Sequence, residues 1–208
     1  MRTPASRLVI ELHYFPGVYW FALAAKSNEL ILEAHEHYTK QTFRNRCYIL
    51  AANKIDRLSV PVVNGKKDDP VTAVRIDYRQ KWQNQHWRAI ASAYGKAPFF
   101  EFYEDIFKQL IYSNEEFLFS LNKKIAMACL QMLQLPVKTR HSDSYLNKYG
   151  AGFTDKRDKI LPNRANGTVT AIAYPQLFSE KFVPGLSILD LLFNEGSNAP
   201  ALVCKQLE

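Results

Sequence analysis

The apolar residues near the start of the chain fall into three short runs that are separated by turn signals. Residues 7–13 are rich in β-branched and aliphatic side chains, which is typical of a strand. Pro16 and Gly17 then interrupt the pattern, and residues 18–27 are almost wholly apolar, as in a helix buried on most sides. A second buried strand is expected at residues 30–32. This strand–helix–strand order predicts a βαβ unit with two parallel strands.

Two further stretches alternate between apolar and polar residues. Residues 46–52 and 57–63 flank a turn-like segment at 53–56, so we expect them to form a β-hairpin. Alternation returns at residues 74–78 and indicates a strand with one solvent-exposed face.

The middle of the chain, residues 80–135, has the periodicity of helices. Pro98 suits the first turn of the second helix, because its missing N–H has no partner to lose there. Ser113 and Glu116 have the spacing of a capping box, which would open the third helix. That helix should end before Pro136.

The last third of the chain alternates between elements and irregular sequence. We expect a strand at 137–141, an irregular loop at 143–167, a strand at 168–173 and a helix at 187–194. Because there are no internal repeats and no linker, residues 1–208 are expected to form one domain. The predicted fold class is α/β, with a small mostly parallel sheet, a βαβ start, an added β-hairpin and a helical middle section.

Charge is distributed unevenly along the chain. The 208 residues carry a net charge of +7. Residues 1–100 hold 15 Lys and Arg against 8 Asp and Glu, whereas the remainder holds 12 of each. A basic surface suits phosphate, a nucleotide sugar, nucleic acid or an acidic headgroup. The alternative is that the charge only keeps the protein in solution.

Several classes of protein are not indicated. The basic start is interrupted by Glu11 and His13 and does not resemble a signal peptide. The longest apolar run, at 18–25, is far shorter than the roughly 20 residues of a membrane helix, so we expect a cytoplasmic protein.

The three cysteines, Cys47, Cys129 and Cys204, are too scattered for a disulfide framework. His35 and His37 are a lone pair without further ligands nearby, so neither a metal nor a cofactor is expected.

The common catalytic motifs are absent: there is no P-loop, no Gly-x-Gly-x-x-Gly and no Gly-x-Ser-x-Gly. A first candidate site is formed by His13 and Tyr14, at the carboxyl end of the first strand, where open α/β sheets bind ligands. His13 could contact a phosphate or act as an acid or base. Alternatively, these aromatic residues are part of the core.

A second candidate site follows the second strand. Arg44 and Arg46 lie two apart, so on a strand both would point to one face and could bind an anion together with Lys40 and Asn45. Glu36 would be their partner or a general base. The alternative is a solvated, charged strand edge.

A third cluster is the charged run at 155–158, in which Arg157 is a candidate for substrate binding. Such runs are usually only solvated. Since the first two clusters leave adjacent strands at the same end of the sheet, we expect Arg46, with Lys40 or Arg44, to line one pocket near His13 or Tyr14.

At these residues the chain resembles the bacterial WbqC-like family. The resemblance is carried by Tyr14-Phe15-Pro16, Lys40-x-x-Phe43-x-Asn45-Arg46, Leu58-Ser59-Val60-Pro61, Ala93-Tyr94-x-x-Ala97-Pro98-Phe99, Tyr174-x-Gln176 and Leu186-Ser187-Ile188-Leu189-Asp190-Leu191. Where the family pattern has Asp-Asp-Val-Gln-Tyr, this chain has Ala34-His35-Glu36-His37-Tyr38. A carboxylate role in this segment would therefore pass to Glu36. The family is linked to surface polysaccharide (O-antigen) genes, and a glycine transferase activity has been proposed for some members.

The resemblance implies a transferase that acts on an anionic activated compound, either aminoacyl (glycine) or sugar-nucleotide linked, in surface polysaccharide biosynthesis. His13 or Glu36 would move a proton, and Tyr14, Lys40, Arg44, Asn45, Arg46 and Arg157 would bind the phosphate- or carboxylate-bearing substrate. The second alternative is a non-catalytic module that binds a nucleotide sugar or a protein partner. RNA binding ranks third, because the chain has no RNA-recognition signature. The sequence leaves the oligomeric state open.

Overall fold

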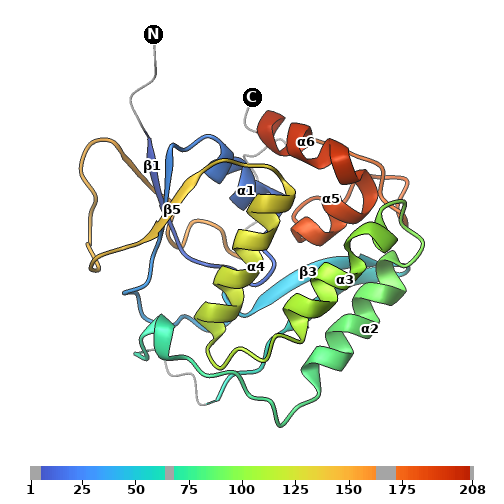
Figure 1. Ribbon diagram of the computed structural model, residues 1–208, viewed down its shortest axis with the longest axis horizontal. Coiled ribbons are helices and arrows are strands. Elements are labelled where there is room, and N and C mark those ends of the chain that lie inside the picture. The colour runs from blue at the N-terminus through green and yellow to red at the C-terminus, as the bar shows by residue number, and fades with distance from the viewer. Residues whose placement is uncertain (1–5, 64–67, 163–171, 207–208) are drawn as a thin grey trace.

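A parallel four-stranded sheet is built from the first and last thirds of the chain. The computed structural model describes residues 6–63, 68–162 and 172–206. The sheet has the strand order β5-β2-β1-β6, and every neighbouring pair is parallel. Its strands are β1 (Arg7–Ile10), β2 (Glu29–Leu32), β5 (Lys138–His141) and β6 (Phe153–Asp155). The predicted α/β class with a mostly parallel sheet is therefore confirmed (Figure 1).

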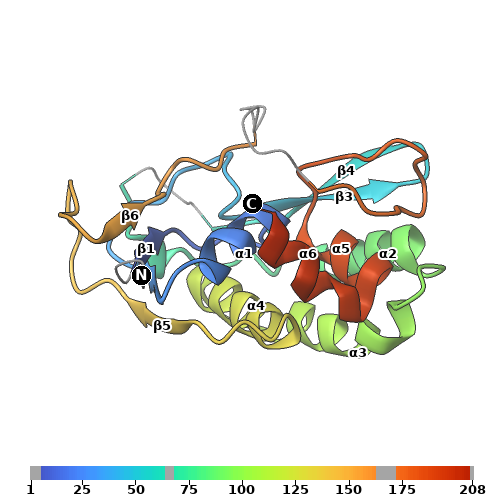
Figure 2. The ribbon, with the colours of Figure 1, turned by 90° about the horizontal axis from the view of Figure 1, so that it is seen from above.

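The βαβ unit at the start is also confirmed. Helix α1 (Val18–Ala25) connects β1 to β2, and Leu8 pairs in register with Leu30. Six of the eight residues of β1 and β2 are buried, whereas Arg7 is exposed and Glu29 is half-buried. Such continuous apolar strands are typical of a parallel sheet covered on both faces. Figures 1 and 2 show α1 and α4 on the same side of this sheet.

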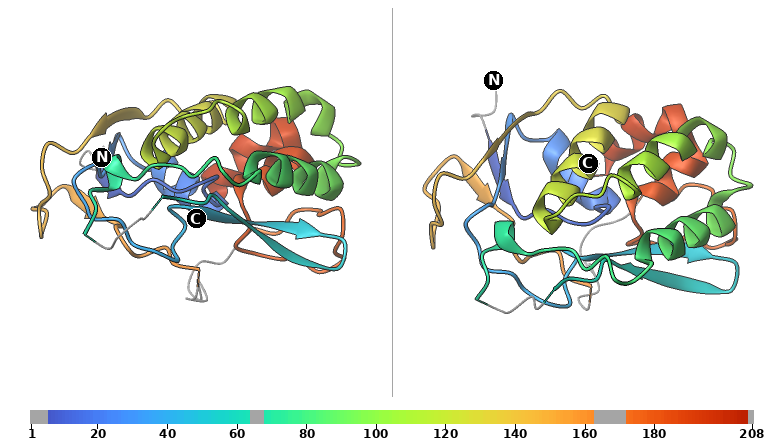
Figure 3. Two further views of the ribbon diagram at one scale, coloured as in Figure 1. Left: turned by 90° about the horizontal axis from the view of Figure 1, so that it is seen from below. Right: turned by 60° about the horizontal axis from the view of Figure 1, so that its bottom comes forward.

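The predicted hairpin is present, but its register differs from the expectation. Strands β3 (Arg46–Ala51) and β4 (Lys54–Ser59) pair antiparallel, and Ala51 faces Lys54. The turn is therefore the two residues between them rather than residues 53–56. The hairpin packs against α2 and α5, on the opposite side of the helices from α4 (Figures 2 and 3).

The strand expected at 74–78 does not form. The backbone N–H of Ile76 donates to Glu116, whereas the next N–H, that of Asp77, donates to Pro61. These contacts are isolated bridges, Ile76 with Val62 and Arg75 with Phe117, and they do not extend into a ladder. The segment is preceded by a short 3-10 turn, η1 (Val71–Ala73).

The helical middle section is confirmed as α2 (Trp82–Tyr94), α3 (Phe100–Ile111) and α4 (Leu118–Met132). Pro98 lies before α3 rather than in its first turn. The predicted capping box at the start of α4 is wrong, because α4 begins after Phe117 without a side-chain cap. Asn114, in the left-handed region with φ of 54°, makes a turn between Ser113 and Glu116 that a capping box does not contain.

Two elements near the C-terminus lie where no element was expected. β6 falls inside the segment 143–167 that was predicted to be an irregular loop, and α6 (Ala199–Lys205) follows the expected last helix. That last helix, α5 (Ile188–Glu195), begins as predicted, since the Ser187 hydroxyl accepts a hydrogen bond from the Leu189 N–H. The strand expected at 168–173 lies mostly outside the described residues.

The end of α5 is fixed by a glycine. Gly196 has a φ of 49° and starts the 3-10 turn η2 (Gly196–Asn198). A Cβ at this position would come within 2.2 Å of the Phe99 ring, so both its conformation and its packing require glycine.

Among the helices of the described residues, none has the length and apolar character that a membrane span requires.

Candidate functional site

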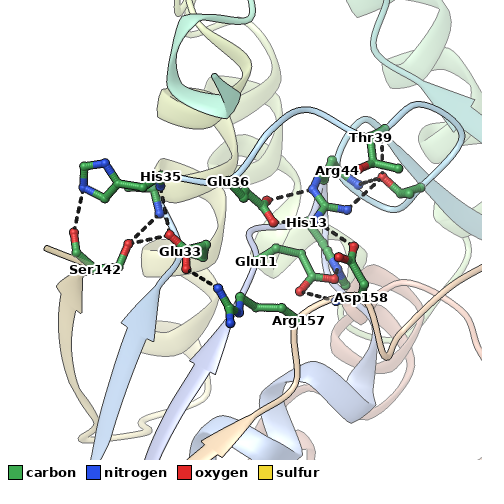
Figure 4. A network of polar contacts seen from close by, with 12 residues as sticks. Glu11, His13, Glu33, His35, Glu36, Thr39, Arg44, Ser142, Arg157 and Asp158 are labelled. Atoms are coloured by element: carbon green, nitrogen blue, oxygen red, sulfur yellow. Dashed lines mark hydrogen bonds and ion pairs between the residues drawn. The ribbon is translucent and has the colours of Figure 1, made fainter. Parts of the chain in front are cut away.

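Polar side chains gather where the parallel strands end. Glu11 directly follows β1, Glu33 follows β2, Ser142 follows β5, and Asp155 is the last residue of β6. Figure 4 shows these strand ends beneath two neighbouring groups of polar contacts. This is the edge at which open α/β sheets hold their ligands. The glutamates are unusual because both are 0% exposed, and a buried carboxylate requires partners.

Glu11 and His13 form a buried carboxylate–imidazole pair. His13 Nε2 lies 3.1 Å from Glu11 Oε1, and both side chains are almost completely buried. Burial raises the pKa of the Glu11 carboxyl, but the hydrogen bond and charge of His13, with the charge of Arg44, outweigh it and lower the pKa overall. The carboxylate is therefore ionised and accepts the hydrogen bond, so Nε2 of His13 carries a proton.

The second ring nitrogen of His13, Nδ1, has no hydrogen-bond partner among the described residues. The ring also lines a cavity, described below, and lies 5.4 Å from the ring of Phe43. An imidazole held in one tautomer by a carboxylate, with its other nitrogen unpaired beside a cavity, has the arrangement of a general base.

Arg44 is the centre of a buried ion-pair cluster beside this pair. Its Nε and Nη2 donate to the two carboxylate oxygens of Glu36 at 2.8 and 2.6 Å, and Nη2 also donates to Asp158 Oδ1 at 3.0 Å (Figure 4). The Arg44 carbonyl accepts a hydrogen bond of 2.7 Å from the Asn122 amide. Arg44 is 1% exposed, so its guanidinium is committed to internal carboxylates.

The cluster contains more carboxylates than its arginine can balance. Burial raises the pKa of Glu36 to about 7, against the opposing effect of Arg44 and with added repulsion from Glu11 and Asp158. The charges of the same carboxylates, Glu36 first, raise the pKa of Arg44 despite its burial. Burial, with the repulsion from Glu11 and Asp158, therefore makes Glu36 easier to protonate than an ordinary glutamate.

Asp158 joins this cluster to the Glu11–His13 pair. Its backbone N–H donates to Glu11 Oε2 at 3.2 Å, while its side chain accepts from Arg44. Asp158 has a φ of 53°, in the left-handed region that a residue with a Cβ adopts only when its surroundings hold it there. Arg44, which is paired with Glu36, therefore also positions Asp158, and Asp158 in turn contacts Glu11.

A second group of contacts lies beside the first and is structural. Arg157 donates to Glu33 at 2.9 Å and to both carboxylate oxygens of Asp155, at 3.0 and 2.7 Å. Its guanidinium also lies over the rings of Tyr145 and Tyr149. The remaining oxygen of Glu33 accepts hydrogen bonds from the Ser142 hydroxyl and the His35 N–H. These contacts tie β2, β5 and β6 together at one edge of the sheet.

A cavity of about 800 Å3 lies next to His13. It is bounded by α1, the β3–β4 hairpin and the segments that flank α5. Its described lining consists of His13, Phe15, Gly17, Val18, Tyr19, Trp20, Phe43, Cys47, Tyr48, Ile55, Ile160, Leu161, Pro162, Ile172, Tyr174, Phe182, Pro184, Gly185, Leu186, Ser187 and Gln206. Burial raises the pKa of the Cys47 thiol, so this cysteine is not an activated nucleophile.

The residues that the sequence singled out have different places in the structure. His13 lines the cavity, and Glu36 and Arg44 meet in the cluster beside it. Lys40, Arg44 and Arg46 do not line the cavity, so the expected arginine pocket around His13 or Tyr14 is not formed by this lining. Their assignment to substrate binding, like that of the other candidate residues, stays a prediction.

Three candidates for substrate binding contact other parts of the fold. The Tyr14 hydroxyl lies 2.9 Å from His86 Nδ1, within the core. The Asn45 amide donates to the Val60 carbonyl at 3.0 Å, which ties the chain to the end of the hairpin. Arg157 takes part in the structural group described above.

The sequence prediction missed Glu11 and Asp158. Glu11 lies two residues before His13, and in extended chain this spacing places two side chains on one side, so a signal was present. Asp158 was noted only as part of a charged run, and its backbone N–H, which is the group that contacts Glu11, leaves no trace in a sequence.

Several residues that carry the family resemblance meet at Asp190. Its carboxylate accepts hydrogen bonds from Tyr94 at 3.0 Å, from Tyr174 at 2.8 Å and from Gln176 at 2.8 Å. Burial raises the pKa of Asp190 despite these donors. Since Tyr174 also lines the cavity, the cluster holds the cavity wall to α5.

Comparison with known proteins agrees with the resemblance. The WbqC-like protein family matches residues 12–161 and 165–201, so the chain belongs to this family. The uncharacterized protein Rv1507c of Mycobacterium tuberculosis is 26% identical over 230 residues, covering 95% of this chain and 98% of that protein. No solved structure matches the chain significantly.

Proposed function

We propose that the protein is a bacterial transferase of surface polysaccharide biosynthesis in which His13 is the general base and Glu11 orients it. The observation that carries the proposal is that His13 lines a cavity of about 800 Å3 while its Nε2 is bonded to a buried carboxylate. In the proposal, the other ring nitrogen, Nδ1, faces the substrate. Membership of the WbqC-like family supports the polysaccharide context.

The proposed reaction transfers a group from an activated donor to an amine or hydroxyl acceptor. His13 Nδ1 takes the proton of the acceptor while the acceptor atom bonds to the activated carbon. The bond from that carbon to the leaving group breaks, and the leaving group keeps the electron pair and receives the proton from the imidazolium. Glu11 stabilises the imidazolium that exists between these steps.

Any anionic part of the donor needs a cation that is not already paired. Arg44 and Arg157 are paired with internal carboxylates. Among the predicted residues, Lys40 is exposed and Arg46 is half-buried, so we assign anion binding to these two. In this proposal Glu36 acts through Arg44 and is not a catalytic residue.

The proposal is tested in the bacterium that encodes the protein. The gene is deleted, and the repeat unit of the surface polysaccharide is analysed by mass spectrometry after complementation. The wild-type gene should restore a missing substituent, whereas His13→Asn should not, because losing a general base slows transfer by roughly 10²–10⁴-fold. His37→Asn, at an exposed histidine, is the matched control and should restore it. Full restoration by His13→Asn at normal protein levels would contradict the proposal.

The absence of charged side chains from the described lining of the cavity favours a second candidate function, a non-catalytic module that binds an apolar ligand. In that case His13→Asn would complement the deletion, whereas variants that fill the cavity would not. RNA binding remains the third alternative, and no specific contact of the structure favours it.

A further inference from the structure

The part of the cavity wall beside His13 that the structure describes has no charged side chains. None of its described lining residues is Asp, Glu, Lys or Arg. The lining also contains polar side chains, but three of them are already hydrogen-bonded within the fold. The Tyr174 hydroxyl donates to Asp190, the Trp20 indole N–H donates to the Glu11 carbonyl, and the Ser187 hydroxyl accepts from the Leu189 N–H. The surrounding side chains are aromatic and aliphatic and come from α1, the hairpin and the segments before and after α5.

A charged group would be unstable inside this wall. Moving an ion from water into apolar surroundings without a partner costs several kcal/mol, and only His13 could offset part of it. An uncharged hydrocarbon group, by contrast, gains about 0.8 kcal/mol for each methylene that it buries. The volume, about 800 Å3, is also that of a site for a drug-sized molecule rather than for a single ion.

We infer that this cavity takes an uncharged hydrocarbon group of the substrate, and that any phosphate or carboxylate of the same substrate lies outside it. The inference rests on the proposed function only in placing this group beside the general base, His13. The hydrocarbon group can be an acyl chain or an aromatic ring, since both have the chemistry that the wall recognises.

The inference is tested by binding of simple probes to the whole chain, measured by isothermal titration calorimetry. The probes are butanamide, hexanamide and octanamide, with benzamide as the aromatic arm and inorganic phosphate as the anionic arm. The Kd of the aliphatic amides should fall about fourfold for each added methylene, which corresponds to 0.8 kcal/mol. Benzamide should compete with octanamide if rings enter the same cavity, and phosphate should not compete.

Two variants locate the binding. Val18→Trp and Ile55→Trp place a large ring in the cavity from α1 and from β4. Each should weaken octanamide binding at least tenfold. Val63→Trp is the matched control, because Val63 is exposed and does not line the cavity, and it should leave the Kd unchanged. Thermal unfolding of all three variants verifies that they fold.

The inference is overturned if the amides show no dependence on chain length, if phosphate displaces octanamide, or if folded Val18→Trp and Ile55→Trp both bind octanamide normally. These outcomes are separable from failure of the proposed function. His13→Asn should still bind octanamide, so loss of complementation in that variant with normal amide binding supports both proposals. If His13→Asn complements the deletion normally and still binds the amides, the proposal that His13 is a general base is contradicted, whereas the inferred hydrocarbon site is not.

Discussion

Arg44 and Asp158 lie 114 positions apart in the chain and meet through a hydrogen bond of 3.0 Å. The contact joins the segment after β2 to the segment after β6, at the edge of the sheet where the candidate site lies (Figure 4). Through the backbone N–H of Asp158 it also reaches Glu11, the partner of His13. The pair therefore links the stability of the fold to the geometry of the proposed general base.

Arg44 should be essential for stability, because it is the cation of a buried cluster. Replacing it with lysine removes the bidentate geometry and leaves the Glu36 carboxylate poorly compensated. We expect Arg44→Lys to lower the free energy of unfolding by about 1–3 kcal/mol, measured by urea denaturation, because lysine keeps the charge but leaves buried acceptors unpaired. Arg46→Lys, at a half-buried arginine two positions away, is the control and should change it by less than about 0.5 kcal/mol. Equal losses in both variants would contradict this role.

The raised pKa of Glu36 predicts a pH dependence. The folded state binds a proton at Glu36 up to about pH 7, whereas the ordinary pKa is 4.5, so between these values the folded state holds more protons than the unfolded state. Glu36 therefore lowers stability as the pH rises through this window, by at most about 1.4 kcal/mol per pH unit. Between pH 4.5 and 7, the wild type should therefore lose unfolding free energy relative to the Glu36→Gln variant. A constant difference would refute the prediction.

The backbone of Asp158 gives a separate prediction. Its left-handed conformation costs about 1 kcal/mol for a residue with a Cβ, and glycine avoids this cost. Asp158→Gly and Asp158→Ala both lose the carboxylate but keep the N–H that contacts Glu11. We therefore expect the glycine variant to be more stable than the alanine variant by about 1 kcal/mol in chemical denaturation. The reverse order would show that the left-handed turn is not maintained in solution.

The Asp190 cluster should contribute strongly to stability without any part in proton transfer. Asp190→Ala would leave the donors of Tyr94, Tyr174 and Gln176 without their shared acceptor, at a cost of about 1–3 kcal/mol for each donor that stays buried and unpaired. We expect a loss of at least about 3 kcal/mol in unfolding free energy. Asp143→Ala, whose side chain is 93% exposed, should be nearly neutral, and a similar effect in both variants would contradict the prediction.

The βαβ start and the helical middle could be predicted from the sequence because their apolar periodicity is strong and local. The edge strand β6 could not, because it has three residues and pairs with β1 on one side, so nearly all of its stabilisation comes from distant chain. The hairpin was recognised but not its register, since alternation continues past both ends of β3 and β4.

The candidate site was predicted only in part for the same reason. His13, Glu36 and Arg44 are conspicuous as residue types, and their convergence follows from adjacent parallel strands. The choice between alternatives does not follow. The sequence left Glu36 as either the partner of the arginines or a general base, and the structure places it on the Arg44 guanidinium. Which partner an arginine takes depends on tertiary distances, which no local pattern contains.

The central claim is that, in the neutral form of His13, Glu11 holds the proton on Nε2 and leaves Nδ1 as the basic nitrogen. It is tested by 15N NMR of the imidazole ring, comparing the wild-type protein with Glu11→Gln at a pH where His13 is neutral. We predict a single tautomer in the wild type, with the proton on Nε2 and Nδ1 bare, and loss of this strict preference in Glu11→Gln. A wild-type His13 with its proton on Nδ1, or a tautomer that is the same with and without the Glu11 carboxylate, would contradict the account.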